Sequence, residues 1–221
     1  DQRAYEDFCA NQEAVEKFTL DKPALVCRWR MSNKKVPMLN RHIRALSERL
    51  VQGEPLTHNM LSWAKQHVEW SLAEGDYTAH DGVLMLVIDI NGNAAMTVGE
   101  YEPLADTSAK ALRARSAEAR SEADETGVAP ELLAAVNDGE LAFVAPADEC
   151  LCGTATLIEQ LAQTKGIPVT RVDIPAQLKG ALFLVSDEHG VVPAADADAA
   201  EADAATVAFF ADGYEKLRAR R

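Results

Sequence analysis

Stretches with strand-like and helix-like spacing alternate along this chain, on both sides of the segment 103–107. In the first half, residues 24–31 alternate apolar and charged side chains and residues 83–90 are almost wholly apolar, so both segments are predicted to be strands. Between them, segments 40–52 and 57–72 carry apolar residues at helical spacing. This alternation predicts a mixed α/β (α+β) chain with two subdomains.

The second half repeats the mixture. Helices are predicted there at 106–125, 154–165 and 204–220, with a short one at 176–180, and strands at 132–136, 141–144, 169–174 and 181–186. The change in character places the subdomain boundary between residues 103 and 104, giving subdomains 1–103 and 104–221, the first with an extra helix over 1–18.

Three local predictions are more specific. Residues 36–39 are predicted to be a strand that completes a hairpin with 24–31. Asn40 is predicted to be the N-cap of the helix that follows. The acidic, alanine-rich segment 196–203 is predicted to be a solvated loop or linker.

The net charge of −13 in 221 residues excludes several classes of partner. Nucleic-acid backbones and anionic membranes both require clustered Lys and Arg, so neither is an expected partner. The polar N-terminus lacks the basic flank and apolar core of a signal peptide, and no apolar stretch approaches the ~20 residues that span a bilayer. We therefore expect a cytoplasmic protein. The four cysteines lack zinc-site spacing, so we expect reduced thiols and no metal.

Residues 36–46, with the sequence VPMLNRHIRAL, form a strand-then-helix segment that is followed by a second helix and a strand pair. This segment resembles the class IV aminotransferases, the fold-type IV pyridoxal-phosphate enzymes that include branched-chain and D-amino acid aminotransferases and aminodeoxychorismate lyase. In that family a helix opens with H-x-x-R-L. The resemblance continues to the C-terminus and implies two subdomains, a site in the cleft between them, and a homodimer.

The resemblance also implies roles for individual residues. Lys110 precedes Glu131 at the family spacing and would form the covalent link to the aldehyde of pyridoxal phosphate. Gly153 and Thr154 would hold the phosphate at a helix N-terminus, and Ser186 would be a second donor. The alternative for Lys110 is a solvated lysine without a ligand. The alternative for Gly153 and Thr154 is a glycine turn followed by a threonine N-cap.

The chain departs from the family pattern at several points. The phosphate-binding arginine of H-x-x-R-L is Ala45 here, and the candidate Arg44 stands one residue earlier. Phe143 replaces the acid that pairs with the pyridinium nitrogen, and segments 91–110 and 141–153 are shorter than in the family.

Two functions follow from this mixture of likeness and departure. The first is an aminotransferase or lyase that uses pyridoxal phosphate and acts on a small amino acid, a keto acid or an amino-chorismate-like substrate. The second is a degenerate, non-catalytic homologue that binds a small anion or a protein partner.

Overall fold

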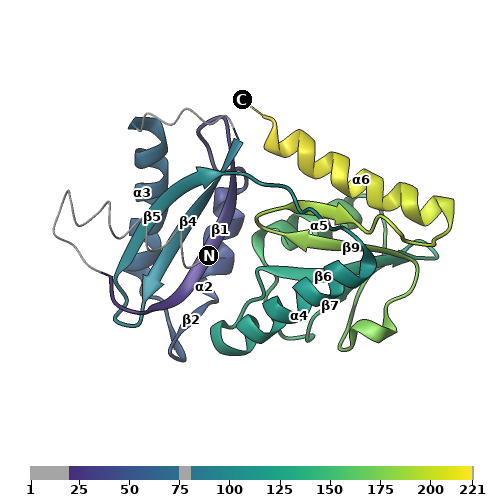
Figure 1. Cartoon of the computed structure of the whole chain (residues 1–221), viewed down its shortest axis with the longest axis horizontal. Helices are drawn as coiled ribbons and strands as arrows, with labels where there is room; N and C mark the ends of the chain where they lie inside the picture. The colour runs from purple at the N-terminus through teal and green to yellow at the C-terminus, as the bar shows by residue number, and fades with distance from the viewer. Residues whose placement is uncertain (1–19, 75–80, 221) are drawn as a thin grey trace.

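The computed structural model describes residues 20–74 and 81–220 of this chain. Two lobes lie side by side, each built on one main sheet (Figure 1). The first sheet has the strand order β1-β4-β5 and the second has the order β10-β9-β6-β7-β8. The predicted α+β class with two sheet-based halves is therefore confirmed.

In the first lobe, the helices pack on one face of an antiparallel sheet. Alternate residues of β1, namely Leu25, Cys27, Trp29 and Met31, are buried against helix side chains, as the alternation in the sequence predicts. The intervening Arg28 therefore belongs to the opposite face. The elements of this lobe are β1 (Pro23–Ser32), α2 (Leu39–Ser47), β2 (Leu50–Val51), β3 (Glu54–Pro55), α3 (His58–Glu74), β4 (Asp81–Asp89) and β5 (Ala94–Glu100).

The second lobe has three layers. Helix α4 packs on one face of the five-stranded sheet through Leu112, whereas α5 and α6 cover the other face through Ile158 and Phe210. Strands β7 and β8 are parallel, and the other pairs are antiparallel. The elements are α4 (Ala109–Thr126), β6 (Glu131–Asn137), β7 (Glu140–Val144), α5 (Gly153–Thr164), β8 (Val169–Val172), a 3-10 turn (Pro175–Gln177), β9 (Ala181–Ser186), β10 (Gly190–Pro193) and α6 (Glu201–Arg218).

Two of the local predictions for the first half are wrong. Segment 36–39 is no strand, because β1 pairs with β4 and the turn after β1 closes through one bridge between Ser32 and Lys35. Asn40 is not the N-cap of α2 either: Met38, in the left-handed region with φ of 61°, precedes the first helical residue.

The acidic segment 196–203 is also more structured than predicted. Its last three residues open α6, and the carboxylate of Asp203 is only 5% exposed. That carboxylate accepts hydrogen bonds from the backbone N–H groups of Asp138 and Gly139, both at 3.0 Å. Asp203 therefore fixes the turn between β6 and β7.

The other sequence predictions have different outcomes. The extra helix over 1–18 lies outside the described residues. The boundary between residues 103 and 104 stays a prediction, although the two main sheets fall on either side of it. Cys27, Cys150 and Cys152 are free thiols. No helix of the described ranges is both long and apolar enough to cross a bilayer.

Contacts at several points hold the lobes together, among them Arg49, which donates to Glu122 at 2.7 Å and to Thr126 at 2.9 Å. Helix α2 packs against α5, and the Arg30 N–H donates to the Asp187 carbonyl at 3.1 Å. At the C-terminal end of α6, Arg218 donates to Asp81 at 2.9 Å. The junction remains open on the side of β1 that carries Arg28, and this opening is the candidate site.

Candidate functional site

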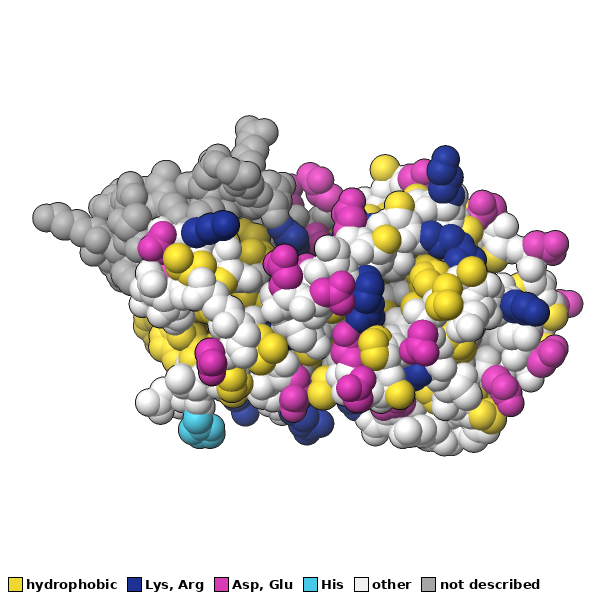
Figure 2. Space-filling view, turned by 90° about the horizontal axis from the view of Figure 1, so that it is seen from below, with side chains coloured by type: hydrophobic (Ala, Val, Ile, Leu, Met, Phe, Trp, Pro, Cys, Tyr) yellow, Lys and Arg dark blue, Asp and Glu magenta, His cyan; other side chains and the backbone are white. Residues whose placement is uncertain are grey.

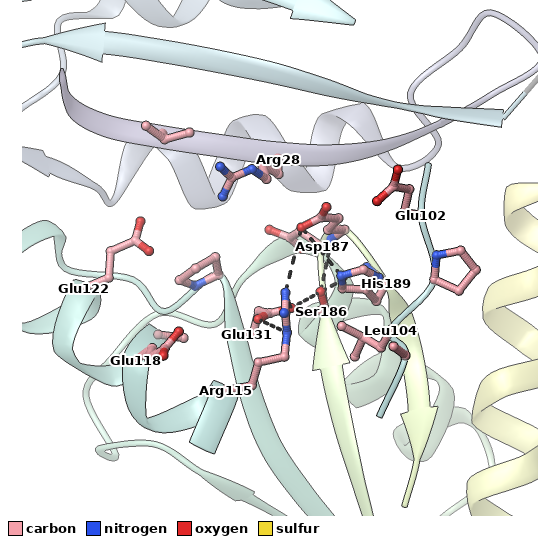
Figure 3. A pocket seen from close by; sticks show the side chains of 16 residues that line it. Arg28, Glu102, Leu104, Arg115, Glu118, Glu122, Glu131, Ser186, Asp187 and His189 are labelled. Atoms are coloured by element: carbon pink, nitrogen blue, oxygen red, sulfur yellow. Dashed lines mark hydrogen bonds and ion pairs between the residues drawn. The ribbon is translucent and has the colours of Figure 1, made fainter. Parts of the chain in front are cut away.

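A cleft of about 540 Å³ lies between β1 of the first lobe and α4, β6 and the end of β9 in the second (Figure 3). Its charged lining is mostly acidic. Two arginines, Arg28 and Arg115, face six carboxylates: Glu102, Glu118, Glu122, Glu131, Asp187 and Glu188. Acidic side chains are also frequent along the junction on the face seen in Figure 2.

The floor of the cleft is a network around Glu131. Strands β6 and β9 are neighbours, and their register places Glu131 opposite Ser186. The Ser186 hydroxyl donates to Glu131 at 2.5 Å and accepts the N–H groups of Glu188 and His189. The guanidinium of Arg115 holds the same carboxylate, with Nε 2.8 Å from Oε1. Arg115 and Ser186 thus both bind the Glu131 carboxylate of the protein itself.

His189 closes one side of the cleft. Its Nδ1 lies 3.0 Å from the Tyr101 hydroxyl, and the guanidinium of Arg30 stacks over the Tyr101 ring at 3.4 Å, a cation–π contact. Burial, with help from Arg115 and Arg30, lowers the pKa of His189 to about 4. Burial raises the pKa of the neighbouring Glu188. His189 is therefore neutral at pH 7 and adds no positive charge to the cleft.

Behind the cleft, the N-terminus of α5 carries an internal anion. The backbone N–H of Thr154 donates to Oδ1 of Asp187 at 3.0 Å, and His42 Nδ1 lies 3.6 Å from the same oxygen. The His42 ring stacks on Trp29 with centroids 5.2 Å apart, and burial lowers its pKa. A helix N-terminus favours a negative charge, and here that charge comes from Asp187.

The structure brings only part of the predicted site together. Ser186 lines the cleft, and Gly153 and Thr154 begin α5 directly behind it, linked to it by Asp187. Lys110 is exposed in the first turn of α4 and is not among the lining residues. Arg44 is exposed on α2 and lines a different hollow, which shares no residue with the cleft. The roles of these residues stay predictions.

Two central residues, Asp187 and Arg115, were missed from the sequence. The segment 187–190 reads as a polar turn, and Arg115 as one of several basic residues in a solvated helix. The sequence could have suggested Asp187 as a site residue, because an acid directly after a buried strand lies at the end of that strand, where loops come together. Among the described residues, no group of three or more His, Cys, Asp or Glu could hold a metal ion.

Comparison with known proteins gives matches by structure alone. No family model matches the sequence, and no curated protein matches it either. A structure assigned as a 4-amino-4-deoxychorismate lyase matches with TM-score 0.60 and 15% identity, covering 90% of this chain and 92% of that one. A hypothetical aminotransferase from Mycobacterium tuberculosis, in its PLP-bound form, matches with TM-score 0.58 and 11% identity, covering 93% and 92%. An aminotransferase from Brucella abortus, bound to the co-factor PLP, matches with TM-score 0.52 and 12% identity, covering 86% and 89%.

This chain has the fold of the fold-type IV pyridoxal-phosphate enzymes. The resemblance inferred from the sequence is therefore confirmed at the level of fold, and two of these neighbours hold pyridoxal phosphate. Identities of 11–15% carry the likeness no further than the fold.

The residues around the cleft do not fit the cofactor that this fold holds in its neighbours. No lysine lines the cleft in the described part of the chain, so the cofactor aldehyde has no amine there. The phosphate would have to enter an α5 N-terminus that the Asp187 carboxylate already fills. Phe143, predicted from the resemblance to replace the ring-pairing acid, is buried in the core under α5 and α6.

Proposed function

We propose that this chain is a non-catalytic homologue of the fold-type IV enzymes that binds a small molecule carrying an ammonium group, such as an amino acid. The observation that carries this proposal is the lining of the cleft, which combines six carboxylates, two arginines and no lysine. The excess of negative charge attracts cations and repels anions. A small anion, the ligand first expected for a non-catalytic member, is therefore the less favoured occupant.

The charged groups of the cleft that make no hydrogen bond or ion pair in the described part of the chain match both ends of an amino acid. Arg28 reaches into the cleft from β1 (Figure 3) and has no hydrogen bond or ion pair within the described ranges. Its guanidinium can bind a carboxylate through two parallel hydrogen bonds. Glu118 and Glu102 likewise lack an ion pair among the described residues, and they supply acceptors for an ammonium group.

Calorimetric titration tests the proposal with matched ligands. We expect amino acids to bind at least tenfold more tightly than the corresponding keto acids, which lack the ammonium group, a difference of about 1.4 kcal/mol. Arg28→Ala should weaken amino-acid binding about tenfold, whereas Lys110→Ala, which changes an exposed residue outside the cleft, should leave it unchanged. Equal binding of keto and amino acids would contradict the proposal.

A second candidate is supported by the PLP-bound neighbours: a pyridoxal-phosphate aminotransferase or aminodeoxychorismate lyase in which Lys110 anchors the cofactor. Its test is separate. Protein mixed with pyridoxal phosphate and then dialysed should keep visible absorbance, lose it in Lys110→Ala, and convert an amino donor to its keto acid. A colourless protein without turnover excludes this candidate and leaves the first intact.

Two finer features complete the proposal. We propose a homodimer, as the resemblance implies, and light scattering of the purified chain measures its mass directly. We also propose a cytoplasmic location, which cell fractionation tests. A monomer in light scattering would remove the dimer without affecting the ligand proposed for the cleft.

A further inference from the structure

The N-terminus of α5 is built like an anion site, but a side chain of the protein itself lies in it. Helix α5 has 12 residues, and its Cys152 N-cap makes no side-chain capping bond. The Thr154 N–H instead donates to the Asp187 carboxylate, which comes from the turn after β9. This carboxylate is 35 residues from the N-cap in sequence, so it is no local cap.

The space around this carboxylate contains more donors than it satisfies. The Thr154 hydroxyl is completely buried and has no hydrogen-bond partner among the described residues. His42 Nδ1 is also buried without a hydrogen-bond partner, 3.6 Å from Asp187 Oδ1. Buried donors without partners are uncommon in folded proteins. Here both lie at the N-terminus of α5, where the Thr154 N–H donates to Asp187 Oδ1.

The walls of the site are close and fixed. A Cβ atom added to Gly153 would lie 2.6 Å from His42 Nδ1 and 3.0 Å from the His42 backbone nitrogen. Trp29 stacks on the far side of the His42 ring. Because one added carbon atom already overlaps α2, the space beside Gly153 has no room for an anion, and the Asp187 carboxylate occupies the position at the Thr154 N–H.

We propose that Asp187 is a built-in anion that occupies an oxyanion site formed by Thr154, Gly153 and His42, and that the site takes an external anion only when this side chain is removed. The ligand class is a small oxyanion, either a carboxylate of the size that leaves, such as formate or acetate, or inorganic phosphate. Asp187 also lines the cleft, but the inference does not depend on the ligand proposed there, because its test follows anions at the Thr154 N–H.

The test is anion binding to Asp187→Gly, followed by the amide resonance of Thr154 and by the melting temperature. We expect formate, acetate or phosphate to shift the Thr154 amide and to raise the melting temperature, whereas chloride at the same ionic strength does neither. A response to formate or acetate alone identifies a site of the size of the lost side chain, and a response to phosphate alone identifies a larger one; either result supports an oxyanion site. A folded Asp187→Gly that responds to no anion overturns the proposal itself.

Two controls keep the outcome decisive if Asp187→Gly is poorly folded. Asp187→Asn keeps the side-chain volume and an acceptor for the Thr154 N–H, so it should fold and bind no anion; binding equal to that of Asp187→Gly would contradict the role of the side chain as a plug. Wild-type protein titrated with phosphate should show an unmoved Thr154 amide. A shift there would mean that anions enter with Asp187 in place, and the proposal would fall.

Discussion

Asp187 and Glu118 are both carboxylates at the junction of the two lobes, but their surroundings differ. Asp187 is 8% exposed, accepts the Thr154 N–H and lies beside His42. Glu118 is exposed on α4 and has no hydrogen bond or ion pair within the described ranges. Both carboxylates line the cleft; we call the buried surroundings of Asp187 the closed end of the junction and the exposed surroundings of Glu118 its open end.

The difference follows from the cost of removing a charge from water. A buried carboxylate is tolerated only where donors replace its hydration, so Asp187 is held by the helix N-terminus. An exposed carboxylate keeps its water and can exchange it for a ligand at little cost. The closed end therefore determines how the lobes fit together, and the open end determines what the protein binds.

The largest expected effect of this comparison is at the closed end. Gly153→Ala places a Cβ atom 2.6 Å from His42 Nδ1 and 3.0 Å from a backbone nitrogen of α2. We expect this overpacking to lower the free energy of unfolding by about 1–3 kcal/mol, measured by urea denaturation. The matched control is Gly99→Ala in β5, where nothing lies within 4 Å of the added atom. Equal stability of the two variants would contradict a tightly packed closed end.

Acid should weaken the protein through its buried histidines. The pKa of His189 is about 4 in the folded protein, against 6.5 for an ordinary histidine, because of burial. The unfolded chain therefore binds the proton more strongly, and stability is lost as the pH falls from about 6.5 towards 4, by at most about 1.4 kcal/mol per pH unit for one histidine. Urea denaturation at several pH values measures this, and His189→Gln should flatten the profile. An unchanged profile in that variant would show that His189 is not responsible.

Neutralising one carboxylate at each end gives a smaller contrast. Asp187→Asn keeps an acceptor for the Thr154 N–H but loses the charge, and we expect a loss of about 1 kcal/mol, the difference between charged and neutral hydrogen bonds. Glu118→Gln should change stability by less than about 0.5 kcal/mol. Thermal denaturation of both variants measures this contrast, which would disappear if Glu118 carried hidden structural contacts.

The smallest expected effect on stability is that of Arg28→Ala. Its guanidinium makes no hydrogen bond or ion pair in the described part of the chain, so the free energy of unfolding should stay within about 0.5 kcal/mol of wild type. The same variant is expected to lose amino-acid binding. A variant that loses both stability and binding would mean that Arg28 supports the fold, and its effect on the ligand would then be indirect.

Much of the fold could be predicted from local patterns. The alternation in 24–31 and the apolar run 83–90 correctly predicted two strands, because burial on a sheet face requires such patterns, but their pairing with each other was not predicted. The strand predicted over 36–39 was wrong, because four mostly apolar residues fit a strand as well as a turn. Only the pairing of β1 with β4 shows that this segment does not pair with β1. The solvated loop predicted over 196–203 was wrong at Asp203, because the carboxylate of this residue accepts hydrogen bonds from a turn more than 60 residues away.

The site was less predictable than the fold. The sequence by itself determined two sheet-based halves, since hydrophobic spacing is a local property, and the family resemblance added the fold-type IV kind. The roles that this resemblance implies for Gly153, Thr154 and Ser186 stay predictions. Only the tertiary structure decided that Asp187 fills the N-terminus of α5 and that Lys110 and Arg44 lie outside the cleft. The reason is physical: which charges meet depends on contacts between elements far apart in the sequence, such as the end of β9 and the start of α5, and no spacing along the chain encodes those contacts.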